Sequence, residues 1–593
     1  MERRVRVVIG LLAIASLARL LSLLWSHPLN WDEIEFFRAA NWIRQGLVPY
    51  RDFWEHHTPL HWFVFAPVTA LVKSRAGVGA VISMRVAQIP LWAVSLWALS
   101  LWMRGVAIEA WARWTAITIL LCSSFFMLAA VEFRVDTLAC ALYIVGLLLI
   151  QQQKRFAAGA VLCLAGLTNI RLGPLLVVTM LLSVLMDPAE RRWRIEWRST
   201  TIFAGALVAF EAGISYLLVT HSAAIAYRSV WTDNYLAEKL APSVPWMLVH
   251  RIAIPFGLRI IGGPAFIAAA IDPATIVVFV VGVIGVVYAI ATRWRAPDGF
   301  FFLAVLQVIN LLFVATMKFL YNYHFEIVML LMVPFVGAAL SDLPGRLKPA
   351  LTLAMAVLVA INVVVVLFRG KEDDLAYQNR IMTAVDQSTP ADGRVFDGVG
   401  WALRRRPAYR YWFLRAIVNV LEKSGRFAPY TVADMQRDPP AAFISDFGAR
   451  VWLATHPDLR RHITAHYLPL WRDLWLPGMS GVLLPRERRE WIVPVSGEYK
   501  IYSSPRIAFH PWFRDPIGTG SYGRSDAYVR LPSSRSVVTL HRGEHFVIQS
   551  RDRRPIGVFV VPVERTELFR QPPRGVDIDG AFLPVTHVPH FSR

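Results

Sequence analysis

Residues 7–33 read VVIGLLAIASLARLLSLLWSHPLNWDE, an apolar run that ends in two adjacent carboxylates. About 20 apolar residues in a helix cross the roughly 30 Å hydrocarbon core of a bilayer, so residues 7–25 predict a membrane-spanning helix. Ionisable groups beside such a helix are costly unless they face water or a partner. We therefore expect Asp32 and Glu33 to have a specific role at the membrane surface.

The composition is that of a polytopic membrane protein with a soluble part. Of the 593 residues, 55% are hydrophobic, which is too apolar for a soluble protein of this length. The formal net charge is +20, but the basic residues are spread over short loops and the last third, so we expect no nucleic-acid partner. All three cysteines lie in apolar segments, which excludes a disulfide framework and a cysteine metal site.

About eleven apolar segments are predicted to be transmembrane helices. They are residues 7–25, 81–103, 112–129, 131–150, 156–170, 172–186, 199–219, 274–291, 299–317, 323–340 and 350–368. Arginine and lysine alternate onto one side of these segments, which the positive-inside rule makes cytoplasmic. We expect a multi-pass protein of the bacterial inner or plasma membrane, with a cytoplasmic N-terminus and an extracytoplasmic C-terminal region.

Hydropathy divides the chain into three predicted domains. Residues 1–369 form the transmembrane domain, whose first outer loop is 26–80, and residues 370–485 mix helical and strand patterns typical of a small α/β domain. Residues 486–593 alternate short strands with turns, which favours a β-sandwich. The predicted strands there are 491–495, 499–502, 537–540, 545–548 and 556–561.

The first outer loop contains most of the unusual polar residues. Asp32 admits a structural interpretation as a helix cap, because residues 35–43 have helical periodicity. His56 and His57 follow Glu55, and a tandem pair is more often structural than ligating. Neighbouring side chains on a helix also point in different directions, so we expect that the two histidines do not ligate one metal ion.

Charged residues from distant segments are predicted at the same outer face. Arg134 and Asp136 open the fourth span, Arg171 lies in an outer turn, and Lys318 ends the ninth span. Taken singly, they could be structural ion pairs or interfacial anchors. Taken together, these carboxylates and cations suit an anionic, lipid-borne substrate with a phosphate group, and a carboxylate could deprotonate an acceptor hydroxyl.

The ordered motifs resemble those of the GT-C membrane glycosyltransferases, in the branch of the protein O-mannosyltransferases and bacterial aminoarabinose transferases. The motifs are Asp32-Glu33, Glu55 to Leu60, Met84-Arg85, Arg134-x-Asp136, Lys318 to Phe325 with Pro334, and residues 439–446. The resemblance covers roughly residues 1–485. Each motif is weak alone, whereas their order on one face is specific.

The resemblance implies an inverting transfer of a sugar from a polyprenyl-phosphate carrier to a glycan, lipid or protein acceptor. Asp32 would be the general base, with Glu33 and Glu55 as further catalytic residues. The donor-binding residues would be His56, His57, Arg134, Asp136, Arg171, Lys318 and Tyr323. No cofactor is certain, and Glu55 and Asp136 are the candidate ligands for a divalent metal ion.

The chain departs from this pattern after the second acidic residue. Relatives often have a double proline there, and the aminoarabinose branch has a lysine where this chain has His56. The aminoarabinose substrate is therefore not carried over. Two alternatives from other classes are a lipid or glycan transporter and a non-catalytic, glycan-binding membrane scaffold, although the internal repeats typical of transporters are not evident.

Overall fold

The computed structural model describes most of the chain in two compact units, one from residues 1–72 and 81–372 and the other from residues 73–80 and 373–586. Nothing is described for residues 1, 73–76, 188–191, 194, 196, 241–257, 262–267, 272, 318–321, 348, 352, 355–356, 358–373, 413–415, 472, 505–535, 551–552, 554–555 and 566–593.

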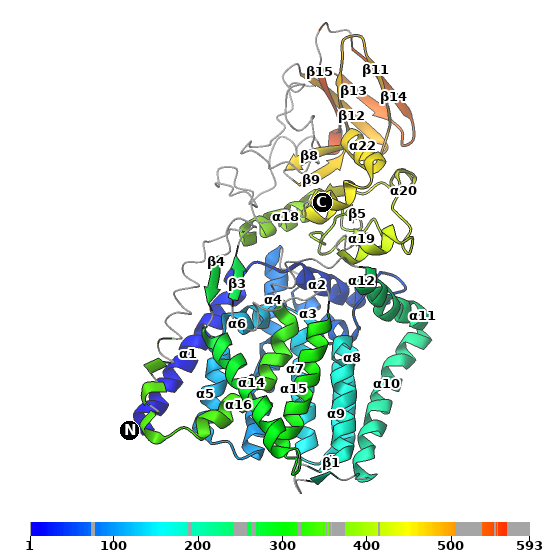
Figure 1. Cartoon of the computed structure of the whole chain (residues 1–593). Helices are drawn as coiled ribbons and strands as arrows, with labels where there is room; N and C mark the ends of the chain where they lie inside the picture. The colour runs from blue at the N-terminus through cyan, green and yellow to red at the C-terminus, as the bar shows by residue number, and fades with distance from the viewer. Residues whose placement is uncertain are drawn as a thin grey trace. The chain divides into compact units, whose positions relative to one another are not determined.

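The first unit is a bundle of apolar helices (Figure 1). Its helices up to the middle of the chain are α1 (Glu2–Ser26), α2 (Trp31–Arg44), α3 (Leu60–Leu71), α4 (Val78–Gly105), α5 (Ala110–Cys122), α6 (Ser124–Val131), α7 (Val135–Gln151), α8 (Arg155–Thr168) and α9 (Gly173–Leu185). The later ones are α10 (Thr201–Val219), α11 (Ala223–Tyr227), α12 (Asn234–Leu240), α14 (Pro273–Arg293), α15 (Gly299–Thr316) and α16 (Glu326–Ser341). Short pairs of strands accompany them: β1 (Met186–Asp187) with β2 (Arg192–Trp193), and β3 (Leu258–Ile261) with β4 (Ala268–Ile271).

Within the described residues, six helices are long and apolar enough to cross a membrane. Each predicted span from 7–25 to 323–340 overlaps a helix, and 350–368 lies mostly outside the described residues. The predicted span 112–129 is two helices, because Ser123 adopts an extended conformation and caps α6 by accepting a hydrogen bond from the Phe126 amide at 3.1 Å. The fold is that of a helical membrane protein, while the total of eleven spans stays a prediction.

The second unit begins with α18 (Asp374–Ser388) and a five-stranded sheet in the order β6-β5-β7-β9-β8. The strands are β5 (Arg394–Phe396), β6 (Arg406–Pro407), β7 (Ala442–Ile444), β8 (Tyr467–Trp471) and β9 (Leu474–Pro477); β5 is parallel to β6 and β7, and β9 is antiparallel to β7 and β8. The helices between them are α19 (Ala416–Lys423), α20 (Val432–Arg437), α21 (Phe447–Leu453) and α22 (Pro457–His466).

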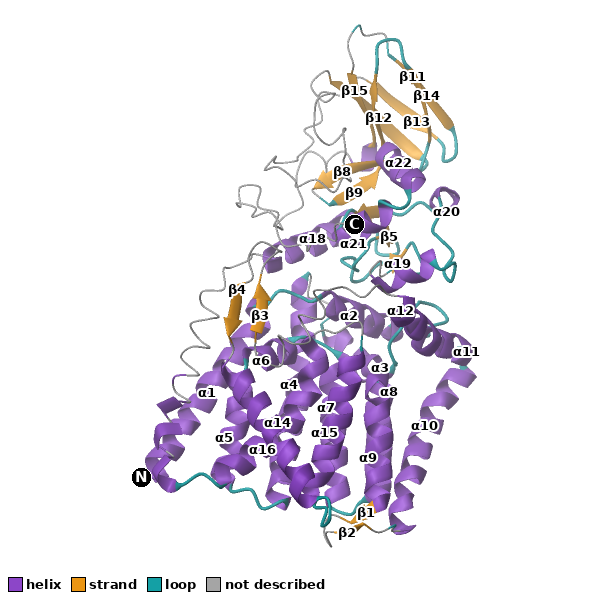
Figure 2. Ribbon diagram, viewed as in Figure 1, coloured by secondary structure: helices purple, strands orange, loops and turns teal. Residues whose placement is uncertain are grey.

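Two further sheets follow, drawn in orange in Figure 2. They are β10 (Met479–Leu483), β15 (Ile556–Pro562), β12 (Gly497–Ser504) and β13 (Ser536–Leu540) in one, and β11 (Arg488–Ile492) with β14 (His545–Gln549) in the other. Strands β11 to β15 occupy the five predicted segments to within a few residues. Trp491 of β11 shares a core with Tyr499 and Val560 of the larger sheet, so the two sheets pack face to face. The boundaries of the three predicted domains stay a prediction.

Helices α8 and α10 approach each other closely through two glycines. A Cβ atom on Gly159 would collide with the Ile202 carbonyl oxygen, and one on Gly205 would collide with the Phe156 carbonyl oxygen. Small residues at such a crossing let two membrane helices pack backbone against backbone. This contact joins α10 to the rest of the bundle.

We predict that Gly159→Ala and Gly205→Ala each destabilise the protein by about 1–3 kcal/mol, because an added methyl group forces the two backbones apart. The measurement is thermal unfolding of the purified protein in detergent. Gly10→Ala is the control, since a Cβ there meets no atom within 4 Å. Equal unfolding temperatures for Gly205→Ala and Gly10→Ala would contradict the prediction.

Candidate active site

Helix α2 begins with a capping box that fixes Asp32 in its first turn. The side chain of Asn30 accepts a hydrogen bond from the Asp32 amide at 3.1 Å, and the Asn30 amide donates to the Glu33 carboxylate at 2.8 Å. Reciprocal bonds of this kind satisfy amides that have no partner within the helix. The N-cap is thus Asn30, and Asp32 is left with a side chain that can interact elsewhere.

Glu33 forms a fully buried ion pair with Arg85 of α4. The two oxygens of the carboxylate are 2.7 Å from Nε and 2.6 Å from Nη2 of the guanidinium, and one oxygen also accepts from the Phe133 amide at 2.8 Å. The remaining Arg85 donors reach the carbonyl oxygens of Leu24, His27 and Pro28. This pair connects α1, α2, α4 and the segment before α7.

Arg134 lies among three carboxylates and one aromatic ring. Its Nη1 atom is 2.8 Å from Asp32 and 3.5 Å from Glu132, and its Nε atom is 3.2 Å from Asp136. The guanidinium carbon is 3.3 Å from the centre of the Tyr323 ring, which adds a cation–π contact. The predicted residues Asp32, Arg134, Asp136 and Tyr323 are therefore brought together from distant segments.

A pocket opens beside this group in the first unit. Its polar lining consists of Asp136, Asn169, Arg171, Asn310, Tyr323 and His324. Asn169 donates to Asp136 at 2.8 Å, and the Arg171 guanidinium bonds the ring of His324 rather than a carboxylate. Arg171 thus presents a positive charge at the pocket. Lys318, predicted beside them, lies outside the described residues.

The carboxylates around Arg134 and Arg85 differ in their access to solvent. The Asp32 side chain is 16% exposed, against 12% for Glu132, 9% for Asp136 and none for Glu33. Asp32 is therefore the most accessible of these four carboxylates. Glu33 is enclosed by its own hydrogen bonds.

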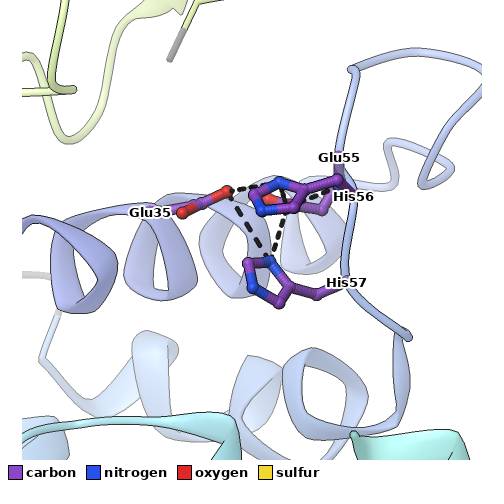
Figure 3. Close-up of side chains that lie close together, drawn as sticks. All are labelled: Glu35, Glu55, His56 and His57. Atoms are coloured by element: carbon purple, nitrogen blue, oxygen red, sulfur yellow. Dashed lines mark hydrogen bonds and ion pairs between the residues drawn. The ribbon is translucent and has the colours of Figure 1, made fainter. Parts of the chain in front are cut away.

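Glu55, His56 and His57 form a second group with Glu35 of α2 (Figure 3). The Nδ1 atom of His56 is 3.4 Å from the Glu35 carboxylate and 3.3 Å from the Glu55 carboxylate. The Nδ1 atom of His57 is 3.8 Å from Glu35 and 3.1 Å from Glu55. The expectation that the two histidines point apart is wrong, because residues 54–57 are not helical and α3 begins only at Leu60.

Burial and mutual contact shift the pKa values of this second group. Burial, followed by repulsion from Glu55, raises the pKa of Glu35, whereas close contacts with both histidines overcome burial and lower the pKa of Glu55. Burial opposes protonation of His56, but the two carboxylates raise its pKa to about 10. Burial and the neighbouring His56 lower the pKa of His57 to about 4. Burial and mutual contact thus shift the pKa values of neighbouring members of the group in opposite directions.

The two groups are neighbours, separated by the ring of Phe36. The ring centre is 5.0 Å from that of His57 and 5.9 Å from the guanidinium carbon of Arg134. Phe36 follows Glu35 directly in α2, so a single helix carries a member of each group and the ring between them.

No family model and no curated protein matches this chain in sequence. Among solved structures it is similar to ArnT from Cupriavidus metallidurans in the apo state, with a TM-score of 0.50, 14% identity, and coverage of 78% of this chain and 97% of that one. The same ArnT bound to undecaprenyl phosphate has a TM-score of 0.49 and 13% identity, with coverage of 76% of this chain and 94% of that one. The archaeal oligosaccharyltransferase AglB from Archaeoglobus fulgidus has a TM-score of 0.40 and 10% identity, with coverage of 79% of this chain and 73% of that one.

This chain has the GT-C fold. The resemblance predicted from the ordered motifs is confirmed at the level of the fold. Residues 26–80 supply Asp32 and Glu55, and the segments that lead into α7 and α16 supply Arg134, which contacts Asp32, and Tyr323, which contacts Arg134.

Sequence reasoning missed several members of the two groups, namely Glu35, Glu132, Asn169 and His324. Glu35 is three residues after Asp32, so helical periodicity could have placed both on one face of α2. Glu132 and Arg134 alternate in the extended segment that leads into α7, and Asp136 follows in the first turn of that helix, so the spacing of the three residues was a signal for one shared site. Asn169 and His324 carried no comparable signal.

We predict that Glu33→Gln destabilises the protein by about 3–5 kcal/mol, because it leaves the Arg85 charge buried without a counter-charge. Denaturant unfolding in detergent measures the loss. Asp458→Asn is the control, since its pair with Arg461 is 77% and 80% exposed and should contribute about 0–1 kcal/mol. Similar losses for the two variants would show that the Glu33 pair does not hold α2.

Proposed function

We propose that the chain is an inverting glycosyltransferase that moves a sugar from a polyprenyl-phosphate carrier to an acceptor on the extracytoplasmic face of the membrane. The observation that carries the proposal is the accessible Asp32 carboxylate, held by Arg134 beside a pocket lined by Arg171. The GT-C fold supports it, because this is the fold of membrane glycosyltransferases to which the ordered motifs also point.

In the proposed reaction, Asp32 accepts the proton of the acceptor hydroxyl as the hydroxyl oxygen attacks the anomeric carbon. The bond from that carbon to the phosphate oxygen breaks, and its electron pair leaves with the carrier phosphate. Attack from the side opposite the phosphate inverts the anomeric configuration. The proton on Asp32 then passes to solvent, to which the side chain is open.

The carrier phosphate gains negative charge as it leaves and needs fixed positive charge nearby. Arg171 is suited to this role because its described side-chain bond goes to a histidine ring, whereas Arg134 already contacts three carboxylates. Tyr323 and His324 line the same pocket, and Lys318 stays a candidate from the sequence.

The other predicted catalytic residues have different surroundings. We assign Glu33 a positioning role, since both of its oxygens are occupied by Arg85 and backbone amides. Glu55, His56 and His57 lie across Phe36 from Arg134 and border the site rather than line the pocket.

We predict that Asp32→Asn lowers sugar transfer by roughly 100- to 10,000-fold, since the amide keeps the shape but cannot accept the proton. The measurement is the intact mass of envelope glycans, lipids and proteins from cells that make each variant at equal membrane levels. Asp52→Asn, in the same outer loop and paired with Arg51, is the control and should transfer normally.

Full transfer by Asp32→Asn would remove the assignment of the base. If the wild-type chain adds no mass to any envelope component but moves labelled carrier lipid across vesicles, the transporter alternative replaces the transferase.

We also predict that Arg171→Ala weakens the binding of undecaprenyl phosphate by about tenfold or more, as expected for a lost charge-assisted hydrogen bond. The probe follows from the ArnT structure, which was solved with this lipid. Binding is measured by the rise in unfolding temperature as the lipid is titrated. Arg51→Ala removes an exposed outer-loop charge and serves as the control. Equal binding by both variants would exclude Arg171 as the phosphate ligand.

A further inference from the structure

The group Glu35, Glu55, His56 and His57 has the composition of a metal site. Each side chain offers one ligand atom, and these four atoms lie within 4.8 Å of one another. Two imidazole nitrogens with two carboxylate oxygens form a donor set that suits zinc and neighbouring transition metals, whereas Mg²⁺ and Ca²⁺ prefer oxygen ligands alone.

The distances between histidine nitrogens and carboxylate oxygens in the group are close to the edge length of a coordination tetrahedron. Bonds of about 2.0–2.1 Å from zinc to nitrogen or oxygen place neighbouring ligand atoms about 3.3–3.4 Å apart. The four distances from a histidine Nδ1 to a carboxylate Oε1 are 3.1, 3.3, 3.4 and 3.8 Å. Three of these four distances lie within about 0.3 Å of that edge length.

Several ligand atoms lack hydrogen-bond partners within the described chain. Both Glu35 oxygens, Oε2 of Glu55 and Nδ1 of His56 are buried and form no hydrogen bond of good geometry there, although His56 Nδ1 faces Glu35 Oε1 at 3.4 Å and Glu55 Oε1 at 3.3 Å. Their side chains are 1%, 0% and 8% exposed. Buried polar atoms normally have partners, so a bound cation would explain why these do not.

The rings are held in place by their surroundings. Asn234 donates to the His56 carbonyl oxygen at 2.7 Å, and the Tyr50 hydroxyl donates to the His57 carbonyl oxygen at 2.6 Å. The Trp54 ring stacks on His56 with an interplanar angle of 15°. Such supporting contacts orient ligands before a metal binds and raise its affinity. His57 is 16% exposed and gives the ion a route in.

We propose that Glu35, Glu55, His56 and His57 bind one transition-metal dication of the zinc type in a closed, four-coordinate site. Four protein ligands leave no position for a water molecule, which is the arrangement of structural rather than catalytic zinc. The ion ties residues 55–57 to α2, one helical turn from Asp32. It is therefore a positioning element and does not contact the sugar donor.

The test uses the full chain, purified in detergent with a histidine-free affinity tag and stripped with a chelator. Zinc is titrated back, and its content is measured by mass spectrometry after removal of free ion. The wild-type chain should retain about one zinc ion in this site, and His57→Gln should bind it at least roughly 100-fold more weakly, beyond the effect of losing a supporting contact.

His462→Gln is the matched control. His462 and His466 stack in α22 with ring centres 4.1 Å apart, so this pair also brings two imidazoles together, but without the two glutamates. Unchanged zinc binding in His57→Gln, or an equal loss in His462→Gln, would overturn the proposal.

Cobalt(II) provides a second measurement that needs no variant. In the stripped wild-type chain, tetrahedral cobalt should give strong visible absorption, which zinc should abolish stoichiometrically by displacing it. The weak spectrum of six-coordinate cobalt, or no uptake, would overturn the proposal even if His57→Gln failed to fold. Metal binding is measured without sugar transfer, so a chain that binds zinc but transfers no sugar would contradict only the proposed function.

Discussion

A guanidinium buried in a membrane protein must have all its donors satisfied, and Arg85 imposes this requirement on the whole outer end of the first unit. Its partners are the Glu33 carboxylate and carbonyl oxygens at the end of α1. Because Glu33 also closes the capping box of α2, the direction of that helix is fixed by the same pair. Asp32 and Glu35 flank Glu33 on α2, so both polar groups take their positions from this one ion pair.

Arg134 is a second buried guanidinium that needs partners for its donors, and its partners carry more charge than those of Arg85. It contacts Asp32, Glu132 and Asp136, so negative charge around it exceeds its own positive charge. Such an excess holds the arginine firmly and leaves it poorly suited to a further anion. Arg171, bonded to a histidine, is the cation with capacity for a phosphate. Under the proposed function, Arg134 would hold the base and Arg171 would receive the leaving phosphate.

Much of this arrangement was predictable from the sequence. Long apolar runs determine helices in a bilayer, and the alternation of basic loops was enough to predict that Asp32, Arg134, Asp136 and Arg171 share one face. The conformation of residues 54–57 was not predictable, because an extended segment before a proline has no periodic signal. The convergence of Glu35 with two histidines depends on that local conformation. The burial of Glu33 depends on Arg85, a contact 52 residues away.

The ring of Phe36 separates the two polar groups, the one around Arg134 and the one formed by Glu35, Glu55, His56 and His57. It contacts His57 on one side and Arg134 on the other, and it is fully buried. A single buried apolar side chain in this position keeps water and protons from passing directly between the two groups. A smaller residue at this position would remove the barrier between the two groups and let water or a proton pass from one to the other. Replacement of this one side chain would thus change the coupling between the two groups without moving any of their charges.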